Sequence, residues 1–145
     1  GAVTASRASV SGAQGGCQAE IGTASAMAAA ALTHLQGGTA LQCAHAFALA
    51  LSNLLGLVCD PVAGLVELPC VRRNVIGAVN AVSAADMALA GIVSRIPADE
   101  VIDAMGEVGE ALPAALRETG LGGLAATPTA QRLTEEIRQA GDGEK

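Results

Sequence analysis

An alanine-rich run over residues 18–35 is the feature that most constrains how this chain folds. After Gln18 it reads AEIGTASAMAAAALTHL, and alanine has the lowest intrinsic cost of any residue in a helix. Gly37 and Gly38 follow, as is common where a helix ends. The chain has one Phe and neither Trp nor Tyr, although 51% of its residues are hydrophobic. The sequence therefore predicts helices that pack closely around small side chains.

Further helices are expected along the rest of the chain. Thr39 is suited to cap a helix, and Pro97 and Pro128 to begin helices. No stretch alternates with the period of two that is typical of a strand. We expect one all-α domain over residues 1–145, a compact bundle of about five to six helices, with residues 1–16 forming a loop or shaped turn. The expected helices after the first cover residues 39–55, 71–90, 97–111 and 128–140.

Residues 56–70, GLVCDPVAGLVELPC, should interrupt this helical pattern. Pro61 and Pro69 forbid one continuous helix, and Gly64 adds another break. We expect an irregular, buried connection, in which backbone polar groups lack regular partners. A bound metal cluster would give such a segment a reason to be ordered.

Three cysteines lie at loop or helix-boundary positions. Cys17 follows two glycines, Cys59 precedes Asp-Pro, and Cys70 follows a proline. Thiolates held close together repel one another unless a cation neutralises them, so convergence would indicate a soft metal or an iron-sulfur cluster. The spacings match neither a zinc ribbon nor a ferredoxin, and on spacing alone inert buried thiols are equally favoured. Cys43 lies within an apolar helix and is expected to pack in the core.

Charge and hydropathy argue against several kinds of partner. The formal net charge is −6, with no Lys/Arg cluster and no aromatic platform, which argues against nucleic acid. Polar residues such as Asn53 interrupt the longest apolar stretch, which argues against a membrane span. Four cysteines without an export signal favour the cytoplasm. With only 15% charged residues, part of the surface should be covered by a second subunit, a missing domain or an identical copy.

Three segments carry a family resemblance. GGCQAEIGTASAMAAAAL, GLVCDPVAGLVELPCVRRN and RETGLGGLAATPT resemble, in the same order, segments of the alpha chain of bacterial iron-sulfur L-serine dehydratase, also called L-serine ammonia-lyase. The resemblance implies that Cys17, Cys59 and Cys70 ligate a 4Fe-4S cluster, which acts as a Lewis acid in the loss of the serine hydroxyl. The products would be pyruvate and ammonia. Arg7 departs from the family pattern, because an Asn is expected there.

The resemblance also implies the parts that would complete such an enzyme. We expect this chain to be a C-terminal piece of a longer alpha chain, inactive without the missing region and a beta domain or subunit, and part of an oligomer. Pyridoxal phosphate is not expected, since it requires a lysine and the only one, Lys145, is the last residue.

Other polar residues receive weaker assignments, and no catalytic residue is assigned. Ser9 and Ser11 are candidates to line the substrate pocket, with turn hydrogen bonds equally favoured. Asp60 is a candidate for a role behind the cluster ligands. His34 and His45 are expected to be structural. Arg72, Arg73 and Asn74 are expected either to be solvated at the surface or to contact a substrate carboxylate. Glu20 is expected to stabilise its helix. The acidic residues of the helix from Pro97 are expected to form a hydrated face: Asp99, Glu100, Asp103, Glu107 and Glu110.

Two alternatives stay open beside the serine dehydratase. One is a related iron-sulfur lyase that acts on another small amino acid, such as cysteine or threonine. The other is a non-enzymatic helical interaction module whose cysteines are incidental.

Overall fold

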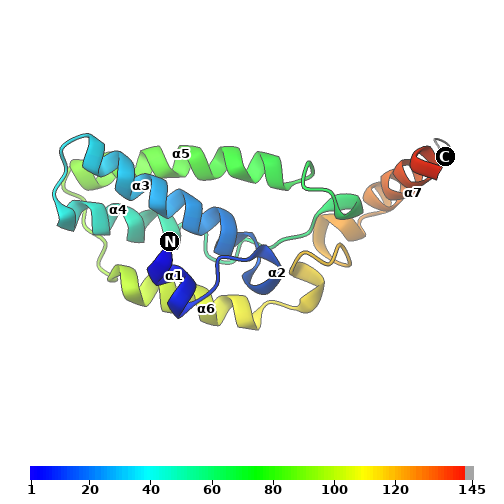
Figure 1. Ribbon diagram of the computed structural model, residues 1–145, viewed down its shortest axis with the longest axis horizontal. Helices are drawn as coiled ribbons and strands as arrows, with labels where there is room; N and C mark the ends of the chain where they lie inside the picture. Colours follow the sequence, from blue (N-terminus) through cyan, green and yellow to red (C-terminus); the bar gives the residue numbers. More distant parts are fainter. Residues whose placement is uncertain (143–145) are drawn as a thin grey trace.

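The computed structural model describes residues 1–142 and confirms the all-α expectation. Four helices form the bundle shown in Figure 1, and in the part of the chain that is described, β-structure is limited to one isolated bridge. Helix α3 packs against both α4 and α5, and α4 also contacts α5 and α6. The bundle helices are α3 (Thr23–Leu35), α4 (Ala40–Ser52), α5 (Cys70–Leu89) and α6 (Ala98–Ala111).

The core of this bundle consists largely of alanine, as the composition predicts. Leu51 and Met105 are the largest apolar side chains in it, at 0% and 1% exposure. Close approach of α5 to the segment that leads into α3 depends on Gly77, where an added Cβ would lie 2.8 Å from Cγ2 of Ile21. Ser25 Oγ donates a hydrogen bond of 2.7 Å to the Gly77 carbonyl at the same crossing. Small side chains therefore bring the helices into near-backbone contact.

The predicted boundary between α3 and α4 is confirmed. Gly37 follows α3 with φ of +83°, a conformation that glycine adopts without steric cost. Thr39 and Gln42 form a reciprocal capping box, in which each side chain accepts from the other residue's backbone N–H. Helix α4 ends at Ser52, three residues before the expected end.

Residues 1–16 differ from the predicted loop. They contain two short helices, α1 (Ala2–Arg7) and α2 (Gly12–Gly15). Helix α1 has no side-chain cap, and tertiary contacts with α6 hold it: Arg7 Nε donates to Oδ1 of Asp103 at 2.9 Å. After α2, Gly16 leads to Cys17 and then to a π-helix, η1 (Gln18–Gly22).

The connection from α4 to α5 is irregular, as expected, but only partly buried. A single 3₁₀ turn, η2 (Val62–Gly64), interrupts it, and the peptide bond before Pro69 is cis. Cys59 and Asp60 are buried, whereas Leu65 and Val66 in the middle are 44% and 57% exposed. The prediction of a buried segment is therefore wrong for its central turn, which faces α7 and solvent.

The last helix, α7 (Pro128–Asp142), extends away from the bundle in Figure 1. It follows two 3₁₀ turns, η3 (Ala114–Leu116) and η4 (Gly123–Ala126). Its residues Leu133 and Ile137 line an apolar groove with Val62 and Leu65. None of the helices described for residues 1–142 has the length and apolarity needed to cross a bilayer.

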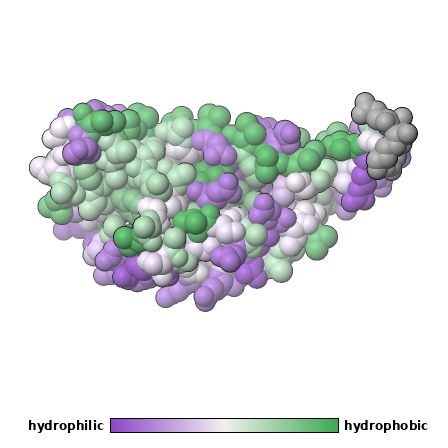
Figure 2. All heavy atoms as spheres, in the orientation of Figure 1, coloured by the Kyte–Doolittle hydropathy of each residue, from purple (hydrophilic) through white to green (hydrophobic). Residues whose placement is uncertain are grey.

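Apolar side chains remain on the surface of the bundle. Figure 2 shows apolar and weakly polar residues spread over the α3 and α5 region, with hydrophilic residues gathered along α6. On α5, Val75, Ile76, Val79 and Val82 are each at least 50% exposed. Isolated proteins seldom expose a continuous apolar helix face of this kind.

Candidate metal centre

Three buried thiols from distant parts of the chain meet at one end of the bundle. The sulfur atoms of Cys17, Cys59 and Cys70 all lie within 4.8 Å of one another, and none is in a disulfide. The residues are 1%, 3% and 7% exposed. We call these residues the thiol trio. Cys43 lies apart from it on α4, where it is half-buried and lines a pocket with Phe47, so it is not part of the fully buried core that the sequence predicts for it.

Gly16 and Gln18 position Cys17. Gly16 has φ of +76°, and an added Cβ would lie 2.9 Å from the Leu57 carbonyl oxygen, so this position requires glycine. The backbone N–H of Gln18 donates to that carbonyl at 2.9 Å. The buried Gln18 side chain donates to the Met105 carbonyl and accepts from the Gly56 N–H. Cys17 is thereby fixed to both the α4–α5 connection and α6.

A late segment of the chain holds Cys59. The Cys59 N–H donates to the Leu116 carbonyl at 2.9 Å, and the Glu118 N–H donates to the Cys59 carbonyl at 2.7 Å. These two bonds create the isolated bridge between Cys59 and Arg117. The sequence reasoning assigned no role to residues 116–118, because no local pattern there indicates pairing with a residue so far away.

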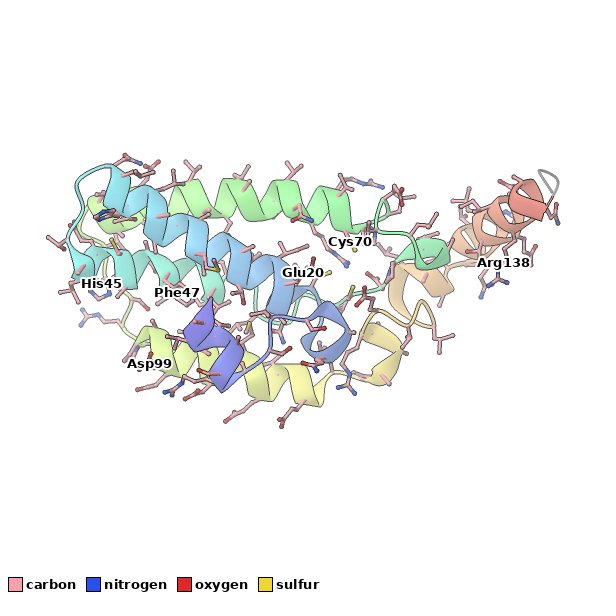
Figure 3. All side chains as sticks on the ribbon, viewed as in Figure 1. Glu20, His45, Phe47, Cys70, Asp99 and Arg138 are labelled. Atoms are coloured by element: carbon pink, nitrogen blue, oxygen red, sulfur yellow. The ribbon has the colours of Figure 1, made fainter. Side chains whose placement is uncertain are left out.

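Cys70 is the first residue of α5. The Asn74 side-chain amide donates to its carbonyl at 3.0 Å, which stabilises the turn that presents the sulfur. The Val62 N–H donates to the Leu68 carbonyl at 2.8 Å and closes the loop just before Cys70. Figure 3 shows the Cys70 side chain near Glu20 and far from His45.

Asp60 and Arg73 lie directly behind the thiol trio. Arg73 Nη1 donates to Asp60 Oδ1 and to the Val58 carbonyl, each at 2.7 Å, and lies 3.9 Å from the Cys17 sulfur. The second Asp60 oxygen accepts from the Leu124 N–H at 2.7 Å. Arg73 is thus half-buried behind the trio rather than fully solvated, whereas Arg72 is exposed.

The surroundings of Cys59 and Cys70 favour the protonated form of these two thiols while no cation is bound. Burial raises the pKa of Cys59, and the neighbouring Cys17 and Cys70 thiols and Glu118 raise it further. Burial likewise raises the pKa of Cys70, together with Cys17. A bound cation would reverse this balance, because metal ligation displaces thiol protons.

The donor set fits a soft metal or an iron-sulfur cluster. Buried thiols are ligands that Zn²⁺ and iron-sulfur clusters take. Within residues 1–142, no His, Asp or Glu joins the three cysteines as a close fourth donor. The chain thus offers three thiolates, and a fourth ligand position would be left to another group.

Two carboxylates stand at the rim of the trio. An added Cβ on Gly12 would lie 3.2 Å from Oε2 of Glu20, 3.5 Å from Oε2 of Glu118 and 3.6 Å from the Cys59 sulfur. Both glutamates are exposed, and Gly12 is buried beneath them. Sequence reasoning gave Glu20 only a helix-stabilising charge and overlooked Glu118. The signal available for Glu118 was its place before the glycine-rich turn at 120–123.

The predicted substrate residues Ser9 and Ser11 hydrogen-bond within a turn. Ser9 Oγ donates to Gln14 Oε1 at 2.6 Å and accepts from the Ser11 N–H at 3.0 Å. Ser9 also lines a cleft of about 620 Å³ with Arg7, Gln14 and Arg117, but none of the three cysteines lines it. A substrate role for the two serines stays a prediction.

The remaining polar candidates lie away from the trio. His34 is exposed at the end of α3, and His45 is half-buried on α4, at the opposite end of the bundle from Cys70 in Figure 3. Most of the acidic residues of α6 are exposed, as expected for a hydrated face. Asp103 is half-buried and pairs with Arg7.

Comparison with known proteins gives a family for this arrangement. A family model described as serine dehydratase alpha chain matches residues 1–125. The chain is 68% identical over 137 residues to the probable L-serine dehydratase alpha chain of Latilactobacillus sakei, and 66% identical over 137 residues to that of Bacillus subtilis. It is 55% identical over 142 residues to the L-serine dehydratase alpha chain of Peptoniphilus asaccharolyticus.

These alignments cover most of this chain but not most of each relative. They include 94%, 94% and 98% of the chain, and 66%, 46% and 49% of the respective relatives. The chain therefore spans between about half and two thirds of the length of these relatives. From the extent of the family match and these identities, the chain belongs to the serine dehydratase alpha-chain family.

Proposed function

We propose that this chain is the cluster-binding part of an L-serine dehydratase, which converts L-serine to pyruvate and ammonia. The observation that carries the proposal is the thiol trio, a buried, disulfide-free donor set in a chain of this family. Three buried sulfur atoms within 4.8 Å of one another match the thiolate donor set of a soft metal or iron-sulfur cluster, which favours a ligand over incidental packing.

Cys17, Cys59 and Cys70 would hold a 4Fe-4S cluster. When bound, such a cluster supplies a Lewis-acidic iron that assists departure of the serine hydroxyl. The protein's own residues bury the thiolates, and Arg73 places a positive charge near Cys17. Asp60 fixes that charge in position through a second bond to the Leu124 N–H.

The partners we propose are L-serine, the rest of a longer alpha chain, and a beta domain or subunit. The relatives are named alpha chains, and roughly a third to a half of their length lies outside the match. The exposed apolar face of α5 is consistent with cover by a further part of an oligomeric enzyme. We place the enzyme in the cytoplasm, because free thiols are kept reduced there.

The cofactor proposal also excludes pyridoxal phosphate. That exclusion depends on Lys145, which lies outside the described residues, so it stays a prediction. A related lyase for cysteine or threonine remains the alternative, since no described residue fixes the substrate side chain.

Anaerobic reconstitution with ferrous iron and sulfide tests the proposal. We expect about four irons per chain, a brown protein, and pyruvate formation from L-serine once the complete enzyme is assembled. Uptake of one zinc with exclusion of iron, or turnover of cysteine or threonine in preference to serine, would contradict it. Comparing pyruvate and 2-oxobutyrate formation across the three amino acids separates the substrates.

A further inference from the structure

A cleft of about 620 Å³ opens where α6 meets α2 and the segment that includes η3. Helix α2 lies beside the end of α6 in Figure 1, and the two helices are in contact. Its volume is in the range of about 300 to 1,000 Å³ that is usual for small-molecule sites. Residues with small side chains leave this space open, among them Ala8, Gly15, Ala19, Gly106, Gly109 and Ala114.

Hydrogen-bond donors from three segments line the cleft. They belong to Arg7, Gln14 and Arg117. Arg7 is already neutralised by its ion pair with Asp103. Arg117, in contrast, forms no ion pair within 4.0 Å among residues 1–142, and its Nη1 makes a long hydrogen bond of 3.4 Å to the Gln14 carbonyl. A guanidinium has several N–H donors, so Arg117 keeps most of them for another group.

The backbone holds Arg117 in place at the cleft. The Leu116 carbonyl accepts from the Cys59 N–H at 2.9 Å, and the Glu118 N–H donates to the Cys59 carbonyl at 2.7 Å. Arg117 lies between these two bonds and is half-buried. A cation that is positioned before a ligand arrives loses less conformational freedom on binding, which favours recognition.

One carboxylate, that of Glu110, also lines the cleft. Glu110 is exposed at the end of α6 and, among the described residues, pairs with neither arginine of the cleft. The cleft therefore offers a guanidinium that suits a carboxylate and, separately, an acidic group that suits an ammonium group.

We infer that this cleft binds the carboxylate group of a small organic acid, with Arg117 as the residue that receives it. A guanidinium can bind a carboxylate through two parallel N–H···O bonds. The inference goes beyond the proposed function, because none of the three cysteines of the thiol trio lines the cleft. Amino acids and 2-oxo acids both carry a carboxylate, and Glu110 would distinguish them because only the amino acid has an ammonium group.

Arginine-selective labelling of the complete enzyme with phenylglyoxal tests the inference. Mass spectrometry of the peptides measures the labelling rate at Arg117 and, as a control, at Arg138, which is exposed on α7 and does not line the cleft. The probes are pyruvate, L-alanine, L-alaninamide, which lacks the carboxylate, and sodium chloride at the same ionic strength. The variant Glu110→Gln is labelled under the same conditions.

We expect pyruvate or L-alanine to slow the labelling of Arg117 in a saturable way, about threefold at twice the dissociation constant by mass action. L-Alaninamide and chloride should leave the rate unchanged, and Arg138 should react equally fast throughout. Protection by L-alanine that weakens in Glu110→Gln would assign the cleft to amino acids. Protection by pyruvate that the variant leaves unchanged would assign it to 2-oxo acids.

Several results would overturn the inference. Equal protection by L-alanine and L-alaninamide would show that the carboxylate is not recognised, and equal slowing at Arg138 would indicate an unspecific effect. Failure of both acids to protect Arg117, or failure of Arg117 to react without any ligand, would contradict an open carboxylate site. Iron uptake and pyruvate formation test the proposed function separately, so its failure would leave the labelling result intact.

Discussion

Arg73, which is half-buried, forms an ion pair with the buried Asp60, and Nη1 of the arginine lies 2.7 Å from Oδ1 of the aspartate. Their side chains are 17% and 3% exposed. The pair joins the start of α5 to the Cys59 segment, and the second aspartate oxygen extends the connection to the Leu124 N–H. One interaction therefore ties together three stretches of chain around the thiol trio.

Replacing Arg73 by Met should destabilise the chain by about 3 kcal/mol or more, because it leaves a buried carboxylate without its partner. The control is Asp103→Asn, which breaks the solvent-exposed pair with Arg7 and should change stability little. Urea denaturation of both variants, measured at the same pH, compares the two pairs. Similar losses in the two variants would contradict a special role for the pair of Arg73 and Asp60.

Substituting the thiols one at a time should separate ligands from packing residues. We expect Cys17→Ser, Cys59→Ser and Cys70→Ser each to lose most of the iron that the reconstituted chain retains, since each removes one of three thiolates. Cys43→Ser should retain it, because Cys43 lies outside the trio. Iron and sulfide assays with absorption spectra provide the measurement. Full retention in any of the three trio variants would remove that cysteine from the ligand set.

Two glycines with positive φ should respond differently to alanine. Gly16 and Gly37 have φ of +76° and +83°. At Gly37 an added Cβ meets nothing within 4 Å, whereas at Gly16 it would lie 2.9 Å from the Leu57 carbonyl oxygen. Gly37→Ala should cost about 1 kcal/mol for the backbone alone.

Gly16→Ala should cost clearly more than Gly37→Ala and should also lower iron retention, since relief of the clash displaces Cys17. Thermal unfolding of the metal-free chain and iron content after reconstitution give the two readouts. Equal stability of the two variants would contradict the close approach described for Gly16.

The metal-free chain should lose stability as the pH rises above the ordinary range of thiol pKa values. In the folded state the pKa values of Cys59 and Cys70 lie above 9.0, the ordinary value for a cysteine thiol. Below pH 9 both states keep these protons. At higher pH the unfolded state releases them while the folded state does not, so unfolding becomes more favourable.

Thermal unfolding between pH 7 and pH 10, under reductant and without oxygen, measures this loss. The double variant Cys59→Ser, Cys70→Ser should show a flatter profile over the same range. A profile as steep as that of the unsubstituted chain would assign the pH dependence to other groups.

Local sequence signals were sufficient to predict most of the bundle. The alanine run, the Thr39 cap and Pro97 each act within a few residues, so their effects can be recognised without knowledge of the fold. Helix α1 could not be found in this way. It has six residues and no side-chain cap, and its stability depends on α6, with which Arg7 pairs through Asp103.

The candidate site shows the same division between local and distant effects. Glycine and proline beside the cysteines indicated boundary positions, which the structure confirms for Cys70 at the start of α5. The backbone hydrogen bonds of Cys59 with Leu116 and Glu118 join residues nearly sixty positions apart in the sequence. No periodicity connects such residues, so their pairing, and with it the carboxylate at the rim, follows only from the folded chain.

The hydrogen bonds between Cys59 and residues 116–118 have a consequence for the order of events during synthesis. When the ribosome has completed α6, all three cysteines of the thiol trio have been made, yet Cys59 still lacks the backbone groups that hold it, and Asp60 lacks the Leu124 N–H. Iron should therefore be captured durably only after translation has passed residue 124. A nascent chain stopped at residue 112 would contain every cysteine and still retain the metal poorly.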